Sequence, residues 1–338
     1  MTKIGINGFG RIGRLLFRQL LEKNNIQIVA VNDLGDMENL AYLLQYDTVY
    51  GRLEADVKVK GRSLLVAGHE VQVLQEKDPA KLPWRMLGVD VVVESTGVFE
   101  SYEKARVHVE AGAKRVIITA PAKDEDSEEG KTVLMGVNED ALSTCVISSN
   151  GSCTTNSASS VVEVLREKLG IKKAVLSTVH GYTATQNLVD GATRGKDFRR
   201  GRAAGQNIVP SSTGAAIAVA RAVKELEGKF DGIAFRVPVV AGSVADITFV
   251  ASRPTSVEEV NTILSEAAQL PRWKGILKVT EEPLVSSDIL KEPYGAIVDL
   301  NFTRVIDGDL VKVLSWYDNE WGYVATLVKH LEAVARSL

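Results

Sequence analysis

The sequence is short of cysteine, of histidine and of long apolar runs, and each shortage excludes a class of protein. Its 338 residues include two cysteines, Cys145 and Cys153, and four histidines. Two cysteines cannot form a disulfide framework or a zinc site, so we expect no bound metal and a reducing, cytoplasmic environment. No apolar run approaches the roughly 20 residues of a membrane-spanning helix. The opening MTKIGINGFG also lacks the charged leader and apolar stretch of a secretory signal.

Charge of one sign is equally scarce. The formal net charge is −3 and the isoelectric point lies near 5.9, which excludes the basic surface typical of nucleic-acid-binding proteins. What is present is a globular composition, with 45% hydrophobic and 25% charged residues. A chain of this length can fold as two ordinary domains, each with its own core. We therefore expect a protein with neither a membrane nor a nucleic-acid partner.

The first half of the chain alternates predicted strands and helices. Residues 4–7 predict a strand, 15–21 a helix and 26–32 a second strand, which together form a βαβ unit. Further β-branched runs, several continuous enough for buried parallel strands, lie at residues 89–96, 114–121, 131–138 and 143–150. The unpatterned charges of residues 123–130 predict a solvated loop. The fold class is therefore α/β, with an N-terminal Rossmann-type doubly wound parallel sheet.

After Gly170 the pattern changes to longer, alternating strands. They occupy residues 174–183, 232–240, 243–252, 296–307 and 310–318. This spacing predicts an α+β domain with a mixed or antiparallel sheet and covering helices. Residues 189–206 carry glycine and arginine without apolar spacing, and long irregular segments inside compact domains are usually functional. Residues 324–338 predict an amphipathic helix that needs a partner surface.

A glycine pattern follows the first predicted strand and opens the first helix. Gly8, Gly10 and Gly13 form G-x-G-x-x-G, and Asp33 ends the next strand. Gly8 permits the turn, Gly10 lets the backbone approach a pyrophosphate, and Gly13 allows close packing of the helix. A purely structural turn is the alternative. With strand, helix and acidic residue in place, dinucleotide binding is favoured, and Asp33 favours NAD because it would repel the 2′-phosphate of NADP.

Cys153 stands where a helix is predicted to begin. Residues 154–157 are of types that cap helices, and apolar residues recur at helical spacing up to Gly170. The positive end of a helix dipole favours a thiolate, and the pKa of such a thiol can fall from about 8.5 to roughly 3.5–7.5 beside a cation. Cys153 is then a candidate nucleophile. A small buried residue without chemistry is the alternative that this stretch leaves open.

A thiolate beside a nicotinamide points to aldehyde oxidation through a hemithioacetal and a thioester, and such chemistry needs a base. The four histidines are the candidates. We expect His69, in a polar turn, and His330, on the terminal helix, to be solvated, and His108 to lie on a surface helix. His180 ends a predicted strand and enters GYTATQ, a position typical of functional loops, and is the favoured partner of Cys153.

These residues also carry a resemblance. INGFGRIGR, QYDTVYG, ESTGVF, GAKRVIITAPA, GSCTTN, TVHGYTATQ, RAAGQNIVPSSTGAA, FRVP and WYDNEWGY resemble phosphorylating glyceraldehyde-3-phosphate dehydrogenases, in the order of that family and over essentially the whole chain. The resemblance implies that Cys153 is the nucleophile and that His180 forms its ion pair. It implies oxidation of D-glyceraldehyde 3-phosphate to 1,3-bisphosphoglycerate with NAD and inorganic phosphate, in the cytoplasm, by a homotetramer. We predict an NAD-binding domain over residues 1–152, completed by the C-terminal helix 319–338, and a catalytic domain over 153–318.

The resemblance further implies three groups of binding residues. The cofactor would contact, besides the glycines and Asp33, Arg11, Ile12, Lys77, Thr96, Gly97, Thr119 and Asn319. The C3 phosphate of the substrate would be held by Thr183, Thr185 and Arg236. Inorganic phosphate would be held by Ser152, Thr154, Thr213 and Gly214. Hydroxyls, a backbone N–H and a guanidinium are suitable donors for a phosphate dianion, although each hydroxyl could instead be an ordinary cap or strand residue.

The chain also departs from the family. Ser157 stands where many relatives have a second cysteine, NGS replaces NAS, and the loop 123–130 and the segment after Asp190 are longer. The sequence VPVVAGSVADI lacks the threonine and asparagine common after RVP. In the family, the segment after Asp190 borders the adenosine end of the cofactor across a subunit interface, so cofactor choice is the prediction most affected. The alternatives are an erythrose-4-phosphate dehydrogenase, which uses water in the last step, a thiol hydrolase, and a binding protein without catalysis.

Overall fold

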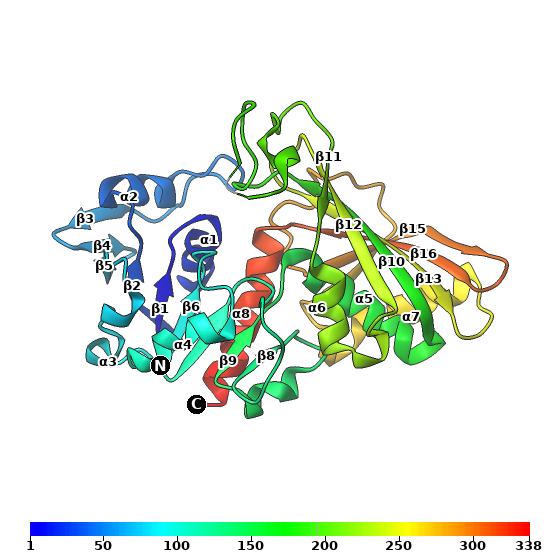
Figure 1. The fold of residues 1–338 in the computed structure, drawn as a ribbon, viewed down its shortest axis with the longest axis horizontal. Helices are drawn as coiled ribbons and strands as arrows, with labels where there is room; N and C mark the ends of the chain where they lie inside the picture. Colours follow the sequence, from blue (N-terminus) through cyan, green and yellow to red (C-terminus); the bar gives the residue numbers. More distant parts are fainter. Residues whose placement is uncertain (194) are drawn as a thin grey trace. The chain divides into compact units, whose positions relative to one another are not determined.

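The computed structural model describes residues 1–193 and 195–338, which form two compact units (Figure 1). The first unit consists of Met1–Val133, Asn138–Gly151 and Leu327–Leu338. The second consists of Leu134–Val137 and Ser152–Thr326. Arg194, in the irregular segment predicted between residues 189 and 206, lies outside the described residues. Each unit has its own sheet and its own core.

The first unit is built on a nine-stranded sheet in the order β3-β4-β5-β2-β1-β6-β7-β9-β8. Its strands are β1 (Thr2–Asn7), β2 (Ile26–Asn32), β3 (Val57–Lys60), β4 (Ser63–Val66), β5 (His69–Leu74), β6 (Val91–Glu94), β7 (Arg115–Ile118), β8 (Gly130–Thr132) and β9 (Ile147–Ser149). From β5 to β8 every neighbouring pair is parallel. The doubly wound parallel sheet predicted from the sequence is therefore confirmed.

Two features of this sheet differ from the prediction. The strands β3 and β4 extend the sheet as an antiparallel hairpin, and no strand was predicted for them or for β5, where His69 begins a strand instead of lying in a turn. The residues of β3 alternate between apolar and charged, whereas those of β4 do not, and Gly61 supplies the positive φ of 61° that the tight turn between the two strands requires. The strand expected at 131–138 is also shorter. Only Gly130–Thr132 pairs with β9, because Leu134–Val137 belong to the second unit.

Two helices of the first unit begin at residues whose side chains satisfy one of their first N–H groups. The helices of this unit are α1 (Arg11–Leu20), α2 (Met37–Gln45), α3 (Trp84–Leu87), α4 (Tyr102–Glu110) and the C-terminal part of α8 (Trp321–Arg336), with short 3₁₀ turns at Pro79–Lys81 and Glu139–Thr144. The side chains of Asp36 and Ser101 cap α2 and α4. In contrast, α1 begins at Gly10 without a side-chain cap. A helix start without a side-chain cap is suited to an anionic ligand.

The second unit has a seven-stranded mixed sheet in the order β11-β12-β10-β13-β16-β15-β14. Its strands are β10 (Ile171–Gly181), β11 (Val209–Ser212), β12 (Phe230–Val237), β13 (Ser243–Ala251), β14 (Leu277–Thr280), β15 (Ala296–Ile306) and β16 (Leu310–Tyr317). The pairs β10–β12 and β14–β15 are parallel and the rest antiparallel, which confirms the mixed sheet. The short strands β11 and β14 were not predicted.

Three long helices pack on the sheet of the second unit. They are α5 (Cys153–Leu169), α6 (Ala215–Ala222) and α7 (Val257–Gln269), with 3₁₀ turns at Phe198–Gly201, Lys224–Leu226 and Pro271–Trp273. Along β13 every second residue is buried, as expected for a sheet with one helix-covered face. Within the described part of the chain, no helix is both long and apolar enough to cross a membrane.

The charged loop 123–130 is mostly exposed, as the sequence predicts. Two of its carboxylates are nevertheless bonded inside the first unit. Asp126 accepts hydrogen bonds from the Tyr102 hydroxyl at 2.8 Å and from the backbone N–H of Thr132 at 2.9 Å. Asp124 accepts one from the backbone N–H of Tyr102 at 2.9 Å. The loop is therefore anchored to the start of α4 and to β8.

Two of the four histidines are buried where the sequence suggested exposure. His330 is fully buried because its face of α8 packs into the first unit. Its Nδ1 lies 3.0 Å from Asn150 Oδ1 and its Nε2 lies 2.8 Å from the Ser148 hydroxyl. His108 is also fully buried. Only His69 is exposed as predicted.

We expect the burial of His330 to make stability fall in acid. Burial and the charge of Arg115 lower the pKa of His330 to about 3, so below the ordinary value of 6.5 the unfolded chain binds a proton that the folded chain does not. The stabilising contribution is complete above pH 6.5 and decreases as the pH falls toward 3. Between pH 7 and pH 5 the loss is about 2 kcal/mol of unfolding free energy.

Urea unfolding of wild type and His330→Gln at both pH values measures this loss. Between pH 7 and pH 5, the unfolding free energy of the variant should change by about 2 kcal/mol less than that of wild type, whatever the variant's stability at neutral pH. His69→Gln, at the exposed histidine, is the matched control and should retain the wild-type pH dependence. Equal pH dependence of wild type and His330→Gln would contradict the expectation.

Candidate active site

Cys153 is the first residue of α5, as predicted from the sequence. Ser152 caps the helix, because its hydroxyl accepts a hydrogen bond from the backbone N–H of Thr155 at 3.1 Å. The Thr155 hydroxyl accepts in return from the backbone N–H of Ser152 at 3.1 Å. This reciprocal capping box holds the first turn in one conformation. The thiol of Cys153 is therefore presented from a fixed helix N-terminus.

His180 lies beside that thiol, from near the end of β10. Its Nε2 is 3.3 Å from Cys153 Sγ, and the imidazole is almost completely buried. Its Nδ1 is 2.7 Å from the carbonyl oxygen of Gly181 and 2.6 Å from Nη1 of Arg236. The carbonyl needs a proton on Nδ1, whereas the guanidinium needs a lone pair, so these two contacts are alternative hydrogen bonds. The parallel register of β10 and β12 places Arg236 directly opposite His180.

The surroundings of this pair favour the neutral thiol and the neutral imidazole. Burial raises the pKa of the Cys153 thiol, while Arg236 and the backbone N–H of Thr154 act in the opposite direction. Burial and the charge of Arg236 lower the pKa of His180 to about 3. The low thiol pKa expected at a helix N-terminus is therefore corrected, because lost hydration outweighs the dipole and the nearby cation. An ion pair needs a change in these surroundings.

Tyr317 contacts both elements of this pair, and no role was predicted for it from the sequence. Its hydroxyl lies 2.8 Å from the Thr154 hydroxyl and 2.7 Å from the Thr178 hydroxyl. Its ring packs edge-on against His180, with the ring centroids 5.9 Å apart. Burial raises the pKa of Tyr317, so its hydroxyl stays protonated at neutral pH. The sequence feature that could have indicated Tyr317 is its position beside Trp316 at the end of an alternating strand.

Hydroxyl and guanidinium groups gather after β10. The hydroxyls of Thr183 and Thr185 are 3.0 Å apart, and Arg200 donates from Nη1 to the Thr185 hydroxyl at 3.3 Å. Arg200 also donates to the Ser211 hydroxyl at 2.9 Å. It lies in the irregular arginine-rich segment, where the sequence did not single out one residue. Together with Arg236 it supplies the donors that a phosphate group needs.

The predicted inorganic-phosphate residues occupy two helix starts. Thr213 and Gly214 precede α6, and the Thr213 hydroxyl accepts from the backbone N–H of Ala215 at 3.2 Å. A Cβ on Gly214 would meet nothing within 4 Å, so the space above that backbone is open. At the start of α5, the Ser152 hydroxyl caps the helix and the Thr154 hydroxyl bonds Tyr317. Both hydroxyls therefore already have partners.

In the first unit a separate pocket of about 530 Å³ surrounds the glycine pattern. It is lined by Asn7, Gly8, Gly10, Asn32, Asp33, Leu34, Glu76, Lys77, Pro79, Ser95, Thr96, Val98 and Phe99. Gly8 has a φ of +97°, which a side chain rarely tolerates, and a Cβ on Gly13 would overlap the carbonyl oxygen of Gly8. A Cβ on Gly10 would meet no atom within 4 Å, which leaves room for a ligand. These residues therefore fit a dinucleotide.

Asp33 is fixed at the rim of this pocket. Its carboxylate accepts from the backbone N–H of Phe9 at 2.7 Å and from that of Gly35 at 2.9 Å. Of the other predicted cofactor residues, Lys77 and Thr96 also line the pocket. The described pocket lining does not include Arg11, Ile12, Gly97 and Thr119.

Several of these residues have other contacts. Arg11 forms an ion pair with Asp47 and lies over the Tyr50 ring. The Thr119 hydroxyl donates to the Glu94 carbonyl at 3.1 Å. Asn319 belongs to the second unit, where its Oδ1 accepts from the backbone N–H of Gly242 at 2.9 Å. Among the residues that the structure describes, no cluster of three or more metal-ligating side chains occurs.

Comparison with known proteins identifies a single family in both parts of the chain. The family model for the glyceraldehyde 3-phosphate dehydrogenase NAD binding domain matches residues 2–102, and that for the C-terminal domain matches residues 152–319. The chain is 50% identical over 330 residues to glyceraldehyde-3-phosphate dehydrogenase 1 of Streptomyces avermitilis, covering 97% of this chain and 96% of that protein. It is 48% identical over 345 residues to the Mycobacterium avium glyceraldehyde-3-phosphate dehydrogenase, covering 100% and 99%. It is 46% identical over 340 residues to that of Clostridium pasteurianum, covering 99% of each.

Proposed function

The chain belongs to the glyceraldehyde-3-phosphate dehydrogenase family, and we propose that it oxidises D-glyceraldehyde 3-phosphate to 1,3-bisphosphoglycerate through a thioester on Cys153. It is an NAD-dependent dehydrogenase. The observation that carries the proposal is the 3.3 Å approach of His180 Nε2 to Cys153 Sγ at the start of α5. A thiol hydrolase would leave the glycine pocket of the first unit without a purpose.

In the proposed reaction Cys153 attacks the aldehyde carbon, and the thiol proton passes by way of His180 to the carbonyl oxygen. The product is a hemithioacetal. When bound, NAD supplies the hydride acceptor. His180 takes the hydroxyl proton as the hydride leaves, and the thioester forms. Inorganic phosphate then attacks the thioester carbon, and the departing Cys153 sulfur recovers the proton from His180.

Arg236 gives the substrate phosphate a role in this proton transfer. Its charge is one of the two causes that lower the pKa of His180. A phosphate dianion held by Arg236 and the Thr183–Thr185 hydroxyl pair would offset that charge. It would also draw the guanidinium from Nδ1, so that Nδ1–H can donate to Gly181. His180 Nε2 would then be free to accept the thiol proton.

The other binding roles follow the same residue types. We assign inorganic phosphate to the start of α6, at Thr213 and Gly214, and to Ser152 and Thr154. Gly10 and the uncapped start of α1 would receive the NAD pyrophosphate, and Asp33 the adenosine ribose hydroxyls. Asn319 would donate from its amide nitrogen to the nicotinamide carboxamide, since its oxygen already accepts from Gly242.

The dependence of the rate on phosphate tests this function. NADH formation should require inorganic phosphate with D-glyceraldehyde 3-phosphate as substrate, because water is a poor replacement in the last step. Erythrose 4-phosphate, oxidised with water as the final nucleophile, is the comparison substrate. A faster, phosphate-independent reaction with erythrose 4-phosphate would reject the proposal in favour of the related dehydrogenase.

We expect Asp33→Ala to weaken the preference for NAD over NADP. The wild-type carboxylate repels the 2′-phosphate of NADP and accepts from the ribose hydroxyls of NAD. Removing it should raise the KM for NAD and lower that for NADP, narrowing the ratio of kcat/KM values about tenfold or more. Steady-state rates with both cofactors measure the ratio, and Asp36→Ala, at the exposed cap of α2, is the control. Equal use of both cofactors by the wild type would contradict the role of Asp33.

We further propose a homotetramer in the cytoplasm. The face of the second sheet opposite its helices exposes Val175, Val179 and Ile233, which the strand register places on one side. An uncovered apolar sheet face is suited to a second copy of the chain. The two unpaired cysteines suit a reducing compartment. Light scattering that gives the mass of one chain at working concentration would contradict the tetramer.

A further inference from the structure

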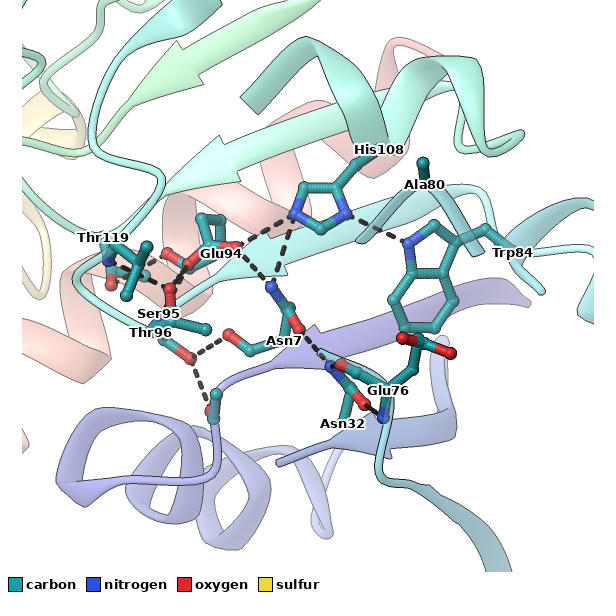
Figure 2. A network of polar contacts seen from close by, with 12 residues as sticks. Asn7, Asn32, Glu76, Ala80, Trp84, Glu94, Ser95, Thr96, His108 and Thr119 are labelled. Carbon is teal, nitrogen blue, oxygen red and sulfur yellow. Dashed lines mark hydrogen bonds and ion pairs between the residues drawn. The ribbon is translucent and has the colours of Figure 1, made fainter. Parts of the chain in front are cut away.

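A network of polar side chains joins residues that line the glycine pocket of the first unit to buried residues that do not line it (Figure 2). At its centre is Glu94, the last residue of β6, which is almost completely buried. One carboxylate oxygen, Oε1, accepts from the backbone N–H of Thr96 at 2.8 Å and from the Thr96 hydroxyl. The other, Oε2, accepts from Asn7 Nδ2 at 2.6 Å and lies 3.0 Å from His108 Nε2. Four polar atoms therefore surround one carboxylate.

His108 can use only one tautomer in this arrangement. The indole Nε1–H of Trp84 lies 3.2 Å from His108 Nδ1, and an indole N–H only donates. Nδ1 must therefore carry a lone pair, and in the neutral ring the proton is on Nε2. From there it donates to Glu94. Both His108 and Trp84 are fully buried, so neither can exchange its partner for water.

On the other side of Glu94 the hydrogen-bond network continues through two asparagines. Asn7, at the end of β1, accepts at Oδ1 from Asn32 Nδ2 at 2.7 Å. Asn32, at the end of β2, donates to the carbonyl oxygen of Glu76 at 3.0 Å and accepts from its backbone N–H at 2.9 Å. These two backbone bonds fix which amide atom of Asn32 faces which partner. Asn32 in turn fixes the orientation of Asn7.

The direction of every hydrogen bond in this network is therefore set at both ends. The Trp84 indole and the Thr96 backbone N–H cannot accept, and the Glu76 backbone groups cannot exchange roles. These donors are all satisfied when both oxygens of the side chain at position 94 are acceptors, as they are in a carboxylate. A glutamine there would turn an NH₂ group toward either Thr96 or the Asn7–His108 pair, and a donor would face a donor. A reversal of Asn7 would move the conflict to Asn32.

The pocket-facing residues of this network are those that a dinucleotide would meet. Asn7, Asn32, Glu76 and Thr96 all line the pocket, whereas Glu94, His108 and Trp84 do not. They come from the carboxyl ends of β1, β2 and β6 and from the segment after β5. Ligands of open parallel sheets bind outside this edge. The three buried residues thus act on the pocket only through the residues that line it.

We propose that Glu94, supported by His108 and Trp84, is a positioning residue for NAD, holding Asn7 and Thr96 in the orientation that binds the cofactor. The proposal rests on the cofactor pocket assigned under the proposed function. Glu94 commits the Thr96 hydroxyl proton inward. One lone pair of that oxygen accepts from the backbone N–H of Val98 at 3.1 Å, and the other can act as an acceptor for the cofactor. It also keeps the Asn7 amide in one of its two orientations. Neither effect requires Glu94 to touch NAD.

NAD binding and kinetics of Glu94→Gln test the proposal. The dissociation constant of NAD, measured by titration calorimetry, should rise about tenfold, and the KM for NAD should rise with it. The kcat at saturating NAD and the KM values for aldehyde and phosphate should stay within twofold, because Cys153 and His180 are unchanged. Glu103→Gln, an exposed glutamate on α4, is the matched control and should bind NAD like wild type.

His108→Phe keeps the proposal testable if Glu94→Gln does not fold. It keeps a ring of similar size and removes one donor from Glu94, so we expect NAD to bind about threefold more weakly. Variants with a lower melting temperature but NAD affinity within twofold of wild type would overturn the proposal, because the network would then only stabilise the fold. Failure of the wild type itself to bind NAD would instead refute the cofactor assignment.

Discussion

Replacing Cys153 by serine should abolish dehydrogenase activity while NAD still binds. A serine hydroxyl is a far weaker nucleophile than a thiol, and at position 153 it would be held in the same capped first turn of α5. No hemithioacetal forms, so kcat should fall about 10⁴-fold or more. NAD affinity should remain near that of wild type, since the glycine pocket belongs to the first unit.

Single-turnover NADH formation and NAD titration of the purified variant measure the two effects. Cys145→Ser is the matched control, because Cys145 is the other cysteine and lies buried in the first unit. It should keep kcat. Substantial turnover by Cys153→Ser would mean that another group attacks the aldehyde, and the thioester proposal would fail.

Replacing His180 by asparagine should lower kcat by about 10²–10⁴-fold, the usual loss of an acid–base group. Asparagine can donate to the thiol but cannot take its proton. The apparent pKa of Cys153, read from the rate of iodoacetamide alkylation against pH, should rise, because no imidazole is left to accept the proton. His69→Asn, at the exposed histidine, should leave both measurements unchanged.

The substrate phosphate offers a second measurement on the same histidine. In wild type, addition of an inert, phosphate-bearing analogue of the substrate should speed alkylation of Cys153, since Arg236 then no longer lowers the pKa of His180. In His180→Asn this acceleration should disappear. An alkylation profile that is the same in wild type and variant would refute the role of His180 as the proton acceptor.

The sequence predicted the site best where one element carries the signal. Cys153 at a helix start and His180 at a strand end each follow from a few neighbouring residues. The glycine pattern predicted the turn at Gly8 because its spacing reflects backbone geometry alone. The distance between Cys153 and His180 did not follow from those patterns. The 3.3 Å between Cys153 and His180 depends on how α5 packs on β10.

The errors arose where a side chain's surroundings come from distant parts of the chain. His330 and His108 each lie on a helix whose local sequence does not show that the histidine is on the buried face, and each contacts residues of other elements. The prediction of a low pKa for the Cys153 thiol was wrong for the same reason. Burial by the surrounding fold raises this pKa more than the helix dipole lowers it. The network around Glu94 left a trace, since Asn7, Asn32 and Glu94 each end an apolar strand with a polar residue. That these residues contact one another depends on the order β2-β1-β6 in the sheet, which the sequence pattern does not determine.

The C-terminal helix bears on how this protein is made. Leu327–Leu338 belong to the same unit as Met1–Val133, and His330 contacts Ser148 and Asn150. A ribosome releases these last residues only after the whole second unit has been synthesised. During synthesis the first unit therefore lacks its last helical segment, and the apolar surface against which Leu327 and Leu331 are buried stays exposed. We expect nascent chains that stall before α8 to be clients of chaperones.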